Sequence, residues 1–113
     1  MFDALKNLGN LGDLMKSAQQ MQAQMQQLQQ ELASRTVTAD AGGGMVVATV
    51  NGRMELVKLK IDKTKIDPTD TDMLEDVIIA ATNAAQARAA DMVKEEMQKK
   101  AQALGLPPGM LGQ

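Results

Sequence analysis

The chain has 113 residues, which fits one small domain, and a net charge of −2. It has no His, Cys, Trp or Tyr and a single Phe, so imidazole catalysis, thiolate chemistry and an ordinary zinc site are excluded. The core must be aliphatic. No run is long and apolar enough for a membrane span, and the first residues do not resemble a signal peptide, so we expect a cytoplasmic protein with no membrane partner.

The first predicted element is a long helix over residues 11–34, preceded by a flexible N-terminal segment over residues 1–10. Apolar residues recur three and four positions apart with mostly Gln between them, as in a heptad seam. The seam consists of Leu11, Leu14, Ala18, Met21, Met25, Leu28 and Leu32. Between Asp13 and Glu31 the only charge is that of Lys16, so the polar face of this helix can approach a polyanion without repulsion.

Three strands are predicted next, over residues 36–41, 45–50 and 53–61. We interpret the three glycines at 42–44 as a flexible connection, and Asn51-Gly52 is typical of a tight hairpin turn. Side chains alternate between the faces of a strand, which predicts an apolar face made of Val46, Ala48, Val50, Val57, Leu59 and Ile61. Lys58 and Lys60 should point to the opposite face.

A second long helix is predicted over residues 71–104. Asp67-Pro68 suits a cap followed by a first-turn proline, and Gly105 should end the helix before the Pro-Pro-Gly run. Its apolar side consists of Leu74, Val77, Ile78, Ala81, Ala85, Met92, Val93, Met97 and Leu104. We expect residues 105–113 to form a flexible C-terminal tail.

The element order predicts an α+β fold: a long helix, a three-stranded antiparallel sheet and a long helix, in one domain over residues 11–104. A small sheet with one apolar face cannot cover two helices of this length, and exposed apolar stripes normally mean association. A two-fold homodimer is the simplest assembly that would bury these apolar stripes. If both helices leave the sheet as one antiparallel arm, their free ends meet, and Lys16, Lys94, Lys99 and Lys100 lie toward its tip.

Each group of charges also has a purely structural interpretation. Glu95 and Glu96 precede Lys99 and Lys100 by four residues, the spacing of helix-stabilising ion pairs. A second basic group surrounds the hairpin and consists of Arg53, Lys58, Lys60, Lys63 and Lys65. On an exposed sheet face, scattered lysines also serve solubility and protect a strand edge.

No motif predicts a cofactor, a metal or a small-molecule substrate. The three glycines do not lead into a helix and no Gly-Lys-Ser/Thr follows, so they are not a P-loop. The acidic residues between 62 and 76 lack the spacing of a calcium loop, and helix capping explains most of them. Without an activated nucleophile or an acid–base pair, the sequence does not predict an enzyme.

Several segments together resemble the YbaB/EbfC family of nucleoid-associated proteins. They are LGNLGDLMK (8–16), AQQMQAQMQ (18–26), GGGMV (42–46), TVNG (49–52), KLKID (58–62), MLEDVI (73–78), AATNAA (80–85) and GLPPG (105–109). The resemblance implies an intertwined homodimer with protruding helical arms, location in the bacterial nucleoid and binding of double-stranded DNA with loose sequence preference. The family motif often has a basic residue where this chain has Val47. We therefore expect the helical arms, and not the sheet, to be the main surface that contacts DNA.

We therefore predict that two helical arms straddle DNA and contact phosphates, with the sheet as a secondary surface. The primary contacts are Lys16, Arg88, Lys94, Lys99 and Lys100, and the secondary contacts are Arg53, Lys58 and Lys60. Two alternatives remain open. A helix–hairpin–helix chain with heptads also resembles a prefoldin-like holdase subunit, which grips unfolded clients with apolar arm tips, and a coiled-coil adaptor has the same pattern.

Overall fold

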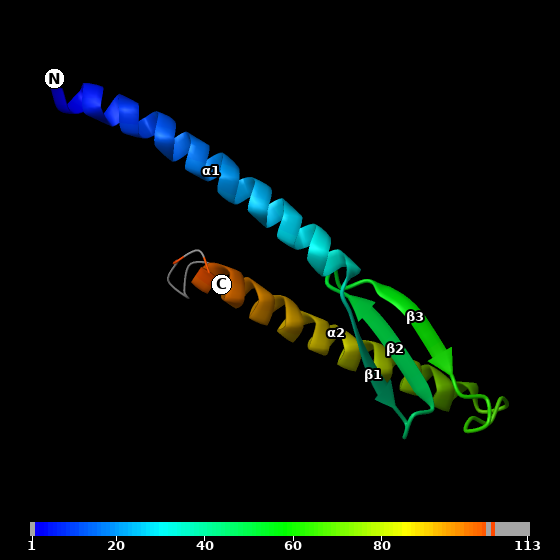
Figure 1. Cartoon of the computed structure of the whole chain (residues 1–113). Coiled ribbons are helices and arrows are strands. Elements are labelled where there is room, and N and C mark those ends of the chain that lie inside the picture. The colour runs from blue at the N-terminus through cyan, green and yellow to red at the C-terminus, as the bar shows by residue number, and fades with distance from the viewer. Residues whose placement is uncertain (1, 104, 106–113) are drawn as a thin grey trace. The chain divides into compact units, whose positions relative to one another are not determined.

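The computed structural model describes residues 2–103 and 105, with side chains from residue 10 onward. The elements follow in the order α1 (Phe2–Ser34), β1 (Thr36–Ala41), β2 (Val46–Asn51), β3 (Leu56–Ile61) and α2 (Thr71–Ala103) (Figure 1). This order confirms the predicted α+β fold. The chain divides into two compact units, Met1–Glu31 and Leu32–Gln113.

Helix α1 begins at Phe2, earlier than the predicted start near residue 11. No proline interrupts residues 2–10, and Gly12 is accommodated inside the helix, although an internal glycine costs about 1 kcal/mol relative to alanine. Leu11, Leu14 and Met21 of the predicted seam are exposed on this helix. The flexibility expected of residues 1–10 stays a prediction.

The turn between β2 and β3 satisfies the carbonyl groups at the end of α1. The Gly52 N–H donates to the Leu32 carbonyl oxygen at 3.0 Å and to the Arg35 carbonyl oxygen at 3.2 Å. A Cβ at Gly52 would lie 2.2 Å from the Leu32 oxygen, a distance that atoms cannot occupy. Glycine is therefore required here by the close approach of the Leu32 carbonyl, which also accepts from the Arg35 N–H at 3.2 Å.

The predicted two-residue hairpin turn is wrong, because β3 starts at Leu56 and residues 52–55 form the turn. Buried Asn51 organises this turn with its side chain. Its Oδ1 accepts from the Arg53 N–H at 2.9 Å and from the Glu55 N–H at 3.1 Å, and its Nδ2 donates to Glu55 Oε1 at 3.0 Å. The left-handed position falls on Met54, with φ of 65°, and not on the predicted Asn-Gly pair.

The sheet is antiparallel with the order β1-β2-β3. Val46, Ala48 and Val50 share the buried face, as predicted. An irregularity between Thr49 and Val50 places Val50 opposite Leu56, so the predicted place of Val57 in the apolar face does not hold. The bulge adds one residue to β3 and breaks the alternation that the sequence pattern assumed.

Helix α2 packs against β1 and β2 through alanines (Figure 1). Ala81, Ala85 and Ala89 recur every four residues and are fully buried against a cluster that consists of Ala39, Val46, Ala48 and Val50. Small side chains on both sides let the helix approach the sheet closely. The largest fully buried side chains are Val46 and Val50, so the core is thin.

The first half of α2, up to Ala89, packs on the sheet, and the second half continues past the strands (Figure 1). Val77 lies against the Gly42 turn, Arg88 reaches the carbonyl of Thr38, and Glu96 reaches Arg35 just before β1. The helix therefore runs the length of β1 in the opposite direction. The 14 residues of α2 after Ala89, the last one in the core packed on the sheet, extend for about 20 Å at 1.5 Å per residue.

The start of α2 agrees with the prediction, but its cap is Asp70. The Asp70 Oδ1 accepts from the Met73 N–H at 3.2 Å, the geometry of an N-cap. Asp67 instead accepts from the N–H and hydroxyl of Thr69 at 2.9 and 2.6 Å. Gly105 has a φ of 73°, which suits a residue after a helix end. Leu104 and the predicted tail beyond Gly105 lie outside the described residues.

Replacing Gly52 tests the contact between this turn and the end of α1. Gly52→Ala is expected to lower the free energy of unfolding by about 2–4 kcal/mol, because the new methyl group displaces the Leu32 carbonyl and breaks its hydrogen bond. Urea unfolding at a fixed protein concentration measures the change. Gly12→Ala is the control, since nothing lies within 4 Å of a Cβ there, and it should be neutral or stabilising by up to about 1 kcal/mol. Equal stability of Gly52→Ala and the parent would contradict the claim that the contact with Leu32 requires glycine at this position.

Candidate nucleic-acid interface

Positive charge is concentrated around the sheet, although the whole chain carries −2. Residues 35–65 contain six Lys and Arg against three Asp and Glu, a local charge of +3. The rest of the chain therefore carries −5. The six cations are Arg35, Arg53, Lys58, Lys60, Lys63 and Lys65. An acidic net charge is thus compatible with a local surface that attracts polyanions.

The outer face of the sheet is the face opposite α2, and the strand register defines its residues. Since Ala39 and Ala48 face α2, their neighbours along each strand point outward. Pairing across the sheet gives two outward rows, which are Asp40, Val47 and Lys60, and Thr38, Thr49 and Lys58. Lys58 and Lys60 pair with the outward residues Thr49 and Val47, which confirms that they point away from the apolar face.

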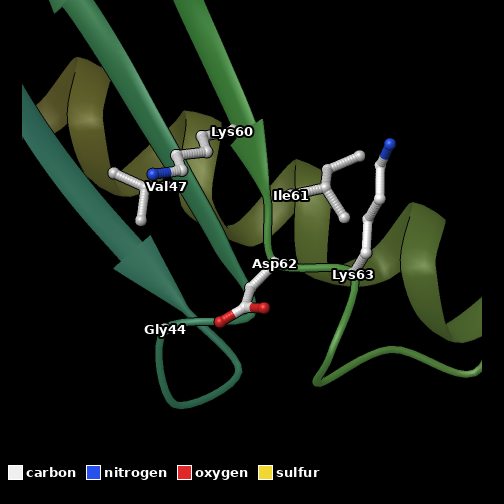
Figure 2. Close-up of a pocket in the computed structure, with 6 residues that line it drawn as sticks. All are labelled: Gly44, Val47, Lys60, Ile61, Asp62 and Lys63. Atoms are coloured by element: carbon white, nitrogen blue, oxygen red, sulfur yellow. The ribbon is translucent and has the colours of Figure 1, made fainter.

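A cavity of about 450 Å³ opens at the end of this outer face, beside the Gly42–Gly44 turn. Its lining consists of Gly44, Val47, Lys60, Ile61, Asp62 and Lys63. Figure 2 shows α2 behind the strands and these side chains in front. Lys60 leans over Val47, while Lys63 extends away from the sheet beside Ile61. The lining therefore combines two apolar side chains, Val47 and Ile61, with two lysines and one acid.

Asp62 is the acid in this lining, and its carboxylate has partners within its own loop. Its Oδ1 accepts from the Thr64 N–H at 3.0 Å and from the Thr64 hydroxyl at 2.6 Å. The hydrogen bond from the Thr64 hydroxyl is the main cause that lowers the pKa of Asp62. Nearby, Lys65 Nζ donates to the Gly43 carbonyl at 3.2 Å, which places a third ammonium group beside the cavity.

The structure distributes the predicted contact residues over three places. Lys16 lies on α1 and is exposed. Arg53, Lys58 and Lys60 lie on the β2–β3 turn and on β3. The remaining four, Arg88, Lys94, Lys99 and Lys100, lie on α2.

Two of the α2 cations have acceptors within the chain. Arg88 Nη1 donates to the Thr38 carbonyl at 2.7 Å, and Lys99 Nζ lies 3.8 Å from Glu96 Oε1. Glu96 also forms an ion pair with Arg35 at 2.5 Å. The hydrogen bond from Arg35 is the main cause that lowers the pKa of Glu96. The end of α2 is therefore a surface of mixed charge.

The prediction omitted Lys63, which lines the cavity with Lys60. The sequence signal that points to it is the segmental charge, because five cations fall between residues 53 and 65 against two acids. Its position beside the end of the sheet depends on how the chain turns after β3, and no periodicity encodes that turn.

Within residues 2–103 and 105, no three side chains capable of holding a metal ion come together. Over the same residues, neither helix has the length and apolar character needed to cross a membrane.

A basic sheet face without a catalytic group or metal cluster on the described residues is typical of a nucleic-acid-binding module. The chain belongs to the YbaB/EbfC DNA-binding family, whose sequence model matches residues 7–104. This is a family of nucleoid-associated DNA-binding proteins, as the resemblance implied.

Two relatives and one crystal structure are similar to this chain. A nucleoid-associated protein of Paramagnetospirillum magneticum is 50% identical over 100 residues, which cover 88% of this chain and 94% of the relative. A nucleoid-associated protein of Moorella thermoacetica is also 50% identical, over 88% of this chain and 96% of the relative. The crystal structure of an uncharacterized protein from Helicobacter pylori matches with a TM-score of 0.56 and 27% identity, over 69% of this chain and 90% of that one.

The Arg35–Glu96 pair predicts an acid-sensitive contribution to stability. A carboxyl whose folded pKa is lowered stabilises the fold above its ordinary pKa of 4.5 and loses that contribution as the pH falls through the lowered value. Glu96→Gln is therefore expected to be less stable than the parent at pH 7 and equal to it in strong acid, once the pH has fallen below the lowered pKa of Glu96. Thermal unfolding across this range measures the difference. A stability gap that does not change with pH would contradict this role of the ion pair.

Proposed function

We propose that this protein binds double-stranded DNA as a homodimer, with low sequence specificity, in the bacterial nucleoid. The observation that carries the proposal is the concentration of +3 charge on residues 35–65 of a chain with net charge −2, in a member of a DNA-binding family. Binding of this kind influences nucleoid organisation and gene expression. Membership in the family supports a location in the cytoplasm, at the nucleoid.

Binding would act through phosphate contacts, since lysine and arginine release counterions from DNA without reading bases. Candidate contacts lie on the sheet (Arg53, Lys58 and Lys60), on α2 (Arg88, Lys94, Lys99 and Lys100) and on α1 (Lys16). The sequence has no Trp or Tyr, so base stacking, on which recognition of single strands depends, has little support. This composition favours duplex DNA as the partner, without a cofactor or small-molecule substrate.

Uncovered apolar surface supports the homodimer. Helix α2 packs on β1 and β2, and on β3 the side chains of Leu56, Val57 and Leu59 remain exposed. A core whose largest fully buried side chains are two valines gives a single protomer little hydrophobic stabilisation. A second copy that covers the apolar side of β3 and leaves the outer face of the sheet free would add the missing burial, and such a two-fold dimer carries two basic sheets.

A second candidate function is that of a holdase or adaptor, which exposed apolar residues on α1 favour. Leu11, Leu14, Met15 and Met21 are all exposed there, and a row of Leu and Met can hold unfolded clients or a partner helix. The charge distribution serves neither the holdase nor the adaptor role, so we place this candidate function second. In both functions the protein acts by binding and not by catalysis.

Salt dependence of duplex binding tests the proposed function. Fluorescence anisotropy with a random-sequence duplex is expected to give an affinity that weakens about tenfold or more between 50 and 200 mM salt. A duplex of different sequence should bind within about threefold. Sedimentation of the same sample should give the mass of a dimer. Absence of duplex binding even at low salt, together with suppression of client aggregation, would contradict DNA binding and support the holdase.

A further inference from the structure

We infer that the outer face of the sheet, and not the end of α2, is the main phosphate-binding surface, and that the cavity beside Lys60 and Lys63 seats a backbone phosphate of DNA. This inference rests on the proposed function and assigns it a location. It reverses the ranking that the sequence suggested, in which the helical arms were primary.

The charge balance separates the two surfaces. Residues 53–65 contain five cations and two acids, a balance of +3. Both acids accept hydrogen bonds within their own turns, Glu55 from Asn51 and Asp62 from Thr64. Residues 88–103 contain four cations and three acids, a balance of +1.

Two of the four α2 cations already have acceptors. Arg88 donates to the Thr38 carbonyl, and Lys99 lies beside Glu96. A phosphate near the end of α2 would also meet Glu95 and Glu96 in the same turn. The electrostatic attraction of a polyanion is therefore stronger at the sheet, where the ammonium groups of Lys58 and Lys60 extend from an exposed strand.

The spacing of groups on the outer face suits a phosphate backbone. Lys58 and Lys60 lie two residues apart on one strand face, about 7 Å along β3, a distance over which each DNA strand carries about two charges along the helix axis. Thr38 and Thr49 occupy the same row as Lys58, and hydroxyl groups donate to phosphate oxygens. The row of Lys60 leads through Val47 to Asp40, which is exposed and opposes binding.

The cavity extends this surface past the end of β3. Lys60 and Lys63 both line it, and Gly44 on the opposite wall adds no side chain. Lys65, held on the Gly43 carbonyl, adds positive potential to the same wall. The Asp62 carboxylate already accepts two hydrogen bonds from Thr64, so the one acid in the lining has donors of its own. An oxyanion entering the cavity meets a net positive environment.

Two matched triple variants of the full chain compare the surfaces. The sheet triple is Lys58→Gln, Lys60→Gln and Lys63→Gln, and the α2 triple is Lys94→Gln, Lys99→Gln and Lys100→Gln. Each removes three charges. Anisotropy with one duplex should show about tenfold or greater weakening for the sheet triple, with a salt slope reduced by about 0.9 for each phosphate that the variant no longer neutralises. The α2 triple should weaken binding by less than about threefold.

Asp40→Asn provides a gain-of-binding test that does not depend on damage to the fold. It removes the acid from the outer face and is expected to tighten duplex binding by about threefold at low salt and less at high salt. Asp91→Asn on α2 is its matched control and should leave the affinity unchanged. Mass and circular dichroism of every variant must match those of the parent for the comparison of triples. If the sheet triple does not form the parent's dimer, the Asp40→Asn result decides.

The outcomes separate this inference from the proposed function. If the parent binds duplex but only the α2 triple loses affinity, or if Asp40→Asn changes nothing, the sheet assignment is wrong and DNA binding stands. If the parent does not bind duplex at any salt concentration, both fail. Calorimetric titration with inorganic phosphate alone distinguishes a free anion from the DNA backbone. No heat is expected, and stoichiometric binding that the sheet triple abolishes would reassign the cavity to a free anion.

Discussion

The close contact of α2 with β1 and β2 is the constraint on which the rest of the structure depends. Ala81, Ala85 and Ala89 bring the helix onto a sheet of small residues, and the helix is then wide enough for only two of the three strands. This contact leaves the outer face free of helices in the Leu32–Gln113 unit and leaves apolar side chains of β3 exposed. Arg88 meanwhile donates to the Thr38 carbonyl on β1. The sheet thus has one uncovered strand and one basic face.

Charge segregation links this architecture to function. Acids cluster in the segment that leads into α2, where Asp67 and Asp70 order the chain and cap the helix, so part of the negative charge serves local structure. The cations of the sheet differ in their contacts. Lys65 binds the Gly43 carbonyl and Arg35 binds Glu96, while Lys58 and Lys60 extend into solvent. A chain of net charge −2 can therefore keep a surface for DNA while remaining repelled from it elsewhere, which favours one orientation of binding.

The sequence predicted the element order, the bounds of β1, the start of α2 and the outward direction of Lys58 and Lys60, because these follow from local periodicity. It could not predict the β2–β3 turn. Gly52 is explained by the approach of Leu32, a residue twenty positions away, and the turn is held by the side chain of Asn51. The bulge that displaces Val57 and the pairing of Arg35 with Glu96 also depend on tertiary structure. For the same reason the cavity beside Lys63, formed where the chain turns after β3, was not predicted.

Amide chemical shifts recorded during titration with a short duplex test the central claim most directly, because they locate the bound DNA without altering the protein. If the basic outer face binds DNA, the largest shifts fall on β3, on the residues after it and on the outward positions of β2, and they decline as salt is added. Shifts confined to α1 and the last turns of α2, with β3 unchanged at saturating duplex, would contradict the account.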